Sequence, residues 1–92
     1  MKITNIDSYK DGGTMKIVTD VLIYYIDNRL KSDTKGDIYI GYPGNEDSKK
    51  VLDQKSAKTE IVRALDDYQS GPFDWSPRVR ELLEENLKKD EG

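Results

Sequence analysis

The chain has 92 residues, a formal net charge of −3, and neither cysteine nor histidine. This length suits one small domain, and we expect residues 1–92 to form a single one. The lack of cysteine excludes disulfides, thiolate metal sites and thiol nucleophiles, and the lack of histidine removes the commonest general base. No signal-like segment and no apolar stretch of ~20 residues is present, so the composition predicts a cytoplasmic protein without a membrane span.

The first strand signals lie near the amino terminus. Residues 2–10 alternate loosely between polar and apolar side chains. The Asp-Gly-Gly sequence at 11–13 then allows the positive φ values that a tight hairpin turn requires. We therefore predict a β-hairpin between residues 2–10 and 14–19.

The densest apolar run of the chain is Val-Leu-Ile-Tyr-Tyr-Ile at residues 21–26. Such a run is too short for periodicity to separate a strand from a helix. Its β-branched and aromatic side chains favour a strand, with Asp20 marking a bend between two strands. A helix over residues 19–30 is the alternative, and it would leave a small hairpin under three helices.

The middle of the chain is mainly polar, with one further strand signal. Residues 33–36 indicate a turn, and residues 37–40 alternate as a short strand does. The Pro-Gly pair at 43–44 ends that strand, because proline cannot donate a ladder hydrogen bond. Residues 45–50 indicate an exposed loop.

Two amphipathic helices are predicted after this loop. The first covers residues 54–69, with Asp53 or Ser56 as its N-cap. The second covers residues 77–89, with Ser76 as the N-cap and a proline in the first helical position. On the first helix, five charged side chains are expected to face solvent: Lys55, Lys58, Arg63, Asp66 and Asp67.

Grouped strands followed by grouped helices predict an α+β domain. We expect a small antiparallel sheet of three or four strands within residues 2–42, with at least the first helix packed on it. Residues 1–50 carry eight acidic and eight basic side chains, whereas residues 51–92 carry ten acidic and seven basic ones. The net negative charge therefore belongs to the helical half.

Aromatic side chains in or beside the predicted turns are candidates for a partner-binding surface. Tyrosine and tryptophan are over-represented among the residues that dominate binding energy at interfaces. A small domain also uses such amphipathic rings to close its core, so both interpretations stay open. The candidates for contact with another protein are Tyr39, Tyr42, Phe73 and Trp75.

The loop at residues 29–36 suggests an alternative partner, single-stranded nucleic acid. Basic residues interleaved with aromatic ones can bind it by charge and by stacking. The basic candidates are Arg29, Lys31 and Lys35. The neighbouring tyrosines are Tyr24, Tyr25, Tyr39 and Tyr42. Three aspartates oppose a net positive patch there: Asp27, Asp33 and Asp37.

Carboxylates suggest a second alternative, a metal-binding protein. Mg²⁺ and Ca²⁺ require oxygen ligands that converge from several directions, and no calcium-loop spacing is present. The candidate ligands form two groups, Asp66, Asp67 and Asp74, and Glu81, Glu84 and Glu85. We interpret the Glu81 and Glu85 pair as part of a solvated helix face. The serines have no histidine to activate them, so no enzyme activity is predicted. No metal site and no cofactor are assigned.

The sequence therefore predicts a small acidic, non-enzymatic protein–protein interaction module, such as an accessory, adaptor or inhibitor protein. A short chain with this simple sheet-plus-helix pattern is typical of small bacterial and phage proteins. Its acidic half would attract a basic partner, which speeds association more than it tightens binding. Self-association is a further expectation, because a chain this short buries little surface on its own.

Overall fold

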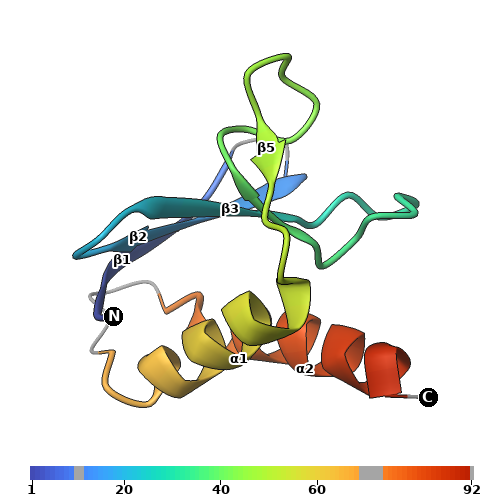
Figure 1. The fold of residues 1–92 in the computed structure, drawn as a ribbon. Coiled ribbons are helices and arrows are strands. Elements are labelled where there is room, and N and C mark those ends of the chain that lie inside the picture. Colours follow the sequence, from blue (N-terminus) through green and yellow to red (C-terminus); the bar gives the residue numbers. More distant parts are fainter. Residues whose placement is uncertain (10–11, 69–73, 92) are drawn as a thin grey trace.

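A computed structural model describes residues 1–9, 12–68 and 74–91, with only the backbone of 90 and 91. A five-stranded antiparallel sheet in the order β1-β2-β3-β4-β5 is followed by two helices, which lie on one side of it (Figure 1). The predicted α+β class is confirmed. The strands are β1 (Ile3–Ser8), β2 (Thr14–Thr19), β3 (Ile23–Asp27), β4 (Ile38–Ile40) and β5 (Lys49–Lys50), and the helices are α1 (Gln54–Leu65) and α2 (Ser76–Glu91).

The predicted amino-terminal hairpin is confirmed by the pairing of β1 with β2. Ile6 lies opposite Ile17, and the register shifts between Ile3 and Asn5. This bulge inserts one extra residue, which brings Ile3 and Ile6 to the same buried face. The loose alternation of the sequence follows from that bulge. Residues 10 and 11 of the predicted turn lie outside the described part of the chain.

The apolar run is a strand, and the helical alternative for residues 19–30 is wrong. A tight turn joins β2 to β3, and the Thr19 hydroxyl accepts the backbone N–H groups of Val21 and Leu22 at 3.2 and 3.0 Å. The Asp20 carboxylate accepts the N–H of Lys2 at 2.8 Å. The bend expected at Asp20 is therefore confirmed.

The sheet has one more strand than the upper limit of the prediction. Residues 45–50 were expected to be a loop, but β5 pairs with β4, with Lys50 opposite Tyr39. A pair of exposed lysines carries no alternation that could indicate a strand. Lysine on a short strand is nevertheless typical of a protected sheet edge.

The first helix is confirmed, with an earlier end and one misplaced side chain. Asp53 is its N-cap and accepts the N–H of Ser56 at 3.1 Å. The helix ends at Leu65, whereas the prediction continued to residue 69. Residues 66–68 are not helical, and residue 69 lies outside the described ranges. Lys58 was expected to face solvent, but it is buried. It lies three residues before Ile61, so it shares the inward face of the helix.

The second helix starts at Ser76 itself, so Ser76 is not the residue that precedes the helix. The carbonyl of Trp75 accepts the N–H of Val79 at 3.0 Å, which is the first helical hydrogen bond. The carboxylate of Asp74 accepts the N–H of Ser76 at 2.9 Å. An aspartate therefore satisfies the amino end of α2 in place of the predicted serine.

The core lies between one face of the sheet and the two helices. It is closed by aliphatic side chains from both layers, which are Ile3, Ile6, Met15, Ile17, Ile26 and Ile38 from the sheet and Ala57, Ile61, Leu65, Val79, Leu82 and Leu83 from the helices. The helices leave the opposite face of the sheet uncovered, and the β4–β5 connection rises on that side (Figure 1).

Candidate functional site

The uncovered face of the sheet carries the side chains that alternate with the core residues. In the pairing of β2 with β3, Met15 and Ile26 face each other in the core, and the next pair is Lys16 with Tyr25. Tyr25 in turn lies opposite Tyr39 on β4. Because successive side chains of a strand point to opposite faces, Tyr25 and Tyr39 stand side by side on the open face.

Two further tyrosines join them from the connections that flank the strands. The ring centroids of Tyr9 and Tyr42 are 4.9 Å apart, with the planes nearly perpendicular at 84°. Tyr25 lies 6.1 Å from Tyr9 and 6.4 Å from Tyr42 between centroids. All four rings are half-buried. We call this group the tyrosine face, and it consists of Tyr9, Tyr25, Tyr39 and Tyr42.

The pKa of the Tyr9 hydroxyl lies above its ordinary value. Burial raises the pKa of Tyr9, and the hydrogen bond with Tyr25 and the nearby carboxylate of Asp7 raise it further. A neutral phenol both donates and accepts hydrogen bonds. The tyrosine face therefore presents aromatic surface together with a protonated hydroxyl.

Arg29 lies beside this face and is held by a buried carboxylate. Its Nε and Nη2 atoms donate to the two oxygens of Asp27 at 3.0 and 2.8 Å, a bidentate arrangement. The side chain of Asp27 is 0% exposed, whereas that of Arg29 is 52% exposed. The hydrogen bond and charge of Asp27 raise the pKa of Arg29, and the electrostatic influence of Tyr39 and Tyr42 adds to this increase. Asp27 lies two residues after Tyr25 on β3, so its side chain points to the same face of the sheet, and Arg29, which is bound to it, borders the tyrosine face.

Asp27 remains ionised although no part of its side chain is exposed. Burial by itself would raise the pKa of its carboxyl group, but hydrogen bonds from Arg29, Thr34 and Ser32 outweigh burial. The pKa of Asp27 is consequently held well below its usual range. The neighbouring Asp37 binds Lys50 at 2.7 Å, so this aspartate neutralises a lysine of β5.

The structure places the predicted binding residues in two layers. Tyr39 and Tyr42 belong to the tyrosine face, whereas Trp75, 39% exposed, directly precedes α2 in the helical layer. Phe73 lies outside the described residues. The sequence alone did not name Tyr9 as part of the site. Its ring contacts depend on the sheet register, for which a single sequence carries no signal.

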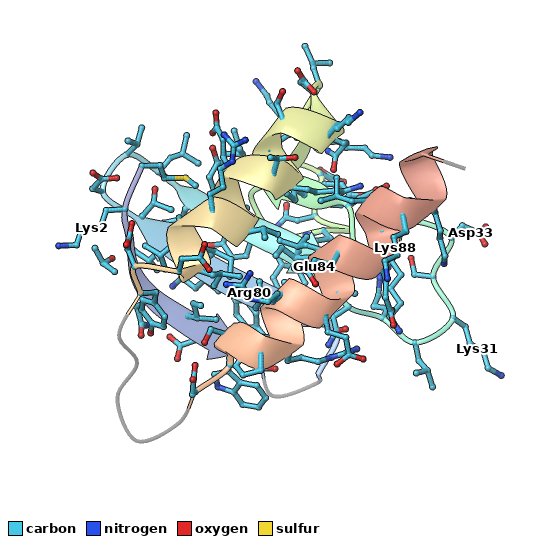
Figure 2. The ribbon with its side chains drawn as sticks, turned by 90° about the horizontal axis from the view of Figure 1, so that it is seen from below. Lys2, Lys31, Asp33, Arg80, Glu84 and Lys88 are labelled. Carbon is cyan, nitrogen blue, oxygen red and sulfur yellow. The ribbon has the colours of Figure 1, made fainter. Side chains whose placement is uncertain are left out.

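The residues proposed for the nucleic-acid alternative have different surroundings. Tyr24 packs against the core, on the opposite side of the sheet from Tyr25. Lys31 is exposed, and Lys35 is half-buried with its carbonyl accepting the Asn86 amide at 2.6 Å. Figure 2 shows Lys31 projecting away from the body of the protein. The structure therefore does not bring Tyr24 to the basic loop.

Three carboxylates of the helical half contact arginines. Arg80 binds Asp66 at 2.6 Å and approaches Glu84 at 3.6 Å, and the latter pair is visible on α2 in Figure 2. Glu81 lies 3.6 Å from Arg78. Among the described side chains, which belong to residues 1–9, 12–68 and 74–89, no three acidic ones are grouped so that they could hold a metal ion.

Comparison of the chain with protein-family models, with curated proteins and with solved structures finds no match. Neither of the two helices in the described part of the chain is long and apolar enough to cross a membrane. The function is therefore inferred from the tyrosine face and its surroundings.

Proposed function

We propose that this protein is a small non-enzymatic interaction module that binds a protein partner through the tyrosine face. The observation that carries the proposal is the gathering of four tyrosines on the sheet face that the helices leave open. An accessory, adaptor or inhibitor protein would use such a surface. The proposed setting is the cytoplasm, because small secreted domains commonly depend on disulfides and this chain has no cysteine.

Tyrosine suits protein recognition for physical reasons. It buries a large apolar ring, has few rotatable bonds, and carries a hydroxyl that can bind a polar group of the partner. The contacts among Tyr9, Tyr25 and Tyr42 already restrict these rings before any partner arrives. Less conformational entropy is then lost on binding, which favours affinity.

Protein is the preferred partner over single-stranded nucleic acid. Base stacking requires an accessible ring face, and the edge-to-face contact of Tyr9 with Tyr42 occupies ring surface. The charge of Lys50 is balanced by Asp37, and the exposed Asp33 lies two residues after Lys31. A nucleic-acid surface needs a net positive patch, and the chain as a whole has a charge of −3.

Site-specific photo-crosslinking tests the proposal. The photoreactive residue p-benzoylphenylalanine replaces Tyr39 in the full chain, in cells that natively express it, and replaces the exposed Glu84 of α2 as the matched control. We expect a covalent adduct with a protein from position 39 and none with that protein from position 84. The captured protein is then purified and titrated with Tyr39→Ala, which should bind at least about tenfold more weakly.

Three results would contradict the proposal. They are equal adducts from both positions, an adduct with nucleic acid alone, and an unchanged affinity of a Tyr39→Ala chain whose circular dichroism shows it folded. Light scattering of the purified chain at low and high salt shows in addition whether the captured partner is a second copy.

A further inference from the structure

The connection between β3 and β4, which we call the β3–β4 loop (residues 28–37), is longer than the topology requires. Neighbouring antiparallel strands can be joined by a two-residue turn. Here the strand ends are already closed, because the N–H of Asp27 donates to Asp37 at 3.0 Å and the N–H of Gly36 donates to Asp27 at 2.7 Å. The residues between these hydrogen bonds form a compact excursion from the sheet.

The buried carboxylate of Asp27 organises the inside of this loop. Its Oδ1 accepts the backbone N–H and the Nε–H of Arg29, both at 3.0 Å. Its Oδ2 accepts Nη2 of Arg29 at 2.8 Å and the hydroxyls of Ser32 and Thr34 at 2.7 and 2.5 Å. A buried charge is costly unless such donors surround it, and here the donors all come from the loop.

The outer sides of the loop are attached to the rest of the molecule. The side chain of Asn28 donates to the carbonyl of Gly12 at 3.1 Å and accepts Nη2 of Arg78 at 3.0 Å. On the other side, Asn86 of α2 donates to the carbonyl of Lys35 at 2.6 Å. The loop is therefore held by the β1–β2 turn, by α2 and by its own buried carboxylate.

The tip of this restrained loop presents an apolar side chain between two cations. Leu30 is 84% exposed, and it lies between Arg29 and the exposed Lys31. Figure 2 shows Lys31 and Asp33 pointing away from the protein on this loop. The carboxylate that balances Arg29 is 0% exposed, so an approaching molecule meets the guanidinium and the leucine rather than Asp27.

We propose that the β3–β4 loop is a preformed docking element that inserts Leu30 into an apolar pocket of a protein partner. Carboxylates at the rim of that pocket would face Arg29 and Lys31. Arg29 is bound to Asp27, whose side chain points to the same sheet face as Tyr25, so the loop and the tyrosine face form one continuous interface. That the partner is a protein rests on the proposed function. Because the loop is already restrained, less conformational entropy is lost when it binds.

The test compares Leu30 with Leu52, the two most exposed leucines of the described chain. Leu52 is the control, because it is 103% exposed and lies outside the proposed interface. The photoreactive p-benzoylphenylalanine is placed at each position in the full chain. We expect an adduct with a protein from position 30 and none with that protein from position 52. The captured protein is then titrated with Leu30→Asp, which should weaken binding at least about tenfold, and with Leu52→Asp, which should change it less than about twofold.

Charge reversal provides a second, independent measurement. Lys31→Glu should weaken binding to the same captured protein, and the weakening should diminish as the salt concentration rises. The absence of an adduct at position 30, an equal adduct at position 52, or an unchanged affinity of Leu30→Asp would each overturn the inference. If a protein captured from position 39 binds Leu30→Asp with unchanged affinity, the docking role of the loop is refuted and the proposed function stands. If a protein captured from position 30 binds Tyr39→Ala with unchanged affinity, the role of the tyrosine face is refuted.

Discussion

At the residue scale, Asp27 combines complete burial with an ionised carboxylate. Arg29, Ser32 and Thr34 supply the donors that keep it charged, and all of them follow it closely in sequence. The same contacts fix the course of the β3–β4 loop. The charge of Asp27 therefore helps to hold the β3–β4 loop in place. Its loss should lower the free energy of unfolding and reduce the order of this loop.

Replacing Asp27 by asparagine preserves size and removes the charge. We expect the free energy of unfolding at neutral pH to fall by about 2 kcal/mol, because hydrogen bonds to an ionised acceptor are stronger than those to an amide. Urea denaturation followed by circular dichroism measures this loss. Asp33→Asn, in the same loop but exposed, serves as the control and should change stability by less than about 0.5 kcal/mol.

The same variant has a characteristic pH dependence. The pKa of Asp27 in the folded protein lies below its ordinary value of 3.8, so below that value the unfolded chain takes up the proton first. The stabilisation is therefore complete above the ordinary value and is lost as the pH falls towards the lower, folded-state pKa. Between about pH 5 and about pH 2, the native protein should lose more stability than Asp27→Asn. Parallel curves would contradict this.

Gly36 and Gly44 form a matched pair for a second prediction. Both have positive φ values, +94° and +85°, but a side-chain carbon on Gly36 would collide with Asn86, whereas Gly44 has open space. Gly44→Ala should cost about 1 kcal/mol of backbone strain, and Gly36→Ala about 2–3 kcal/mol. Chemical denaturation of the two variants measures the difference. Equal losses would mean that the close approach of Asn86 costs nothing.

At the scale of elements, a buried lysine joins the two helices to the sheet. Lys58 of α1 is 1% exposed, and its ammonium group donates to Oδ1 of Asn86 on α2 at 2.5 Å. It also lies 3.5 Å from Asp37, the residue before β4. Because Asn86 holds the carbonyl of Lys35, these contacts link both helices to the β3–β4 loop.

A double-mutant cycle measures this connection. Lys58→Met should cost about 1–3 kcal/mol of unfolding free energy, because it removes the ammonium group that donates to Oδ1 of Asn86 in the interior. Combining it with Asn86→Leu should cost about 1 kcal/mol less than the sum of the single changes. Lys55→Met, on the exposed side of the same helix, is the control and should cost less than about 0.5 kcal/mol. Additive losses would show that the two residues act separately.

At the scale of the whole molecule, the two layers differ in chemistry. The helical half of the chain carries ten acidic and seven basic side chains, whereas the half that forms the sheet is balanced. The tyrosine face lies on the side of the sheet that the helices leave uncovered, and Figure 1 shows that side open. A partner that docks on the sheet therefore avoids the acidic layer, and the modest charge of −3 steers its approach only weakly.

Much of the fold was predictable because its signals are local. The Asp-Gly-Gly turn indicated the first hairpin, and Asp20 indicated the bend before β3. The 3.6-residue periodicity and the Asp53 cap indicated α1. Each of these features depends on the conformations that a few consecutive residues prefer, so a single sequence is sufficient to read them.

Tertiary structure alone decided the remaining features, because they depend on residues far apart in sequence. The two lysines of β5 form a strand only because their backbone pairs with the edge of β4. Lys58 can stay buried because Asn86 of α2 and Asp37 of the sheet layer lie close to its ammonium group. Tyr9 and Tyr42 meet only because the connections after β1 and β4 come together over the face of the sheet that carries Tyr25. Local propensity carries no information on such long-range pairing, and it is that pairing which assembles the candidate site.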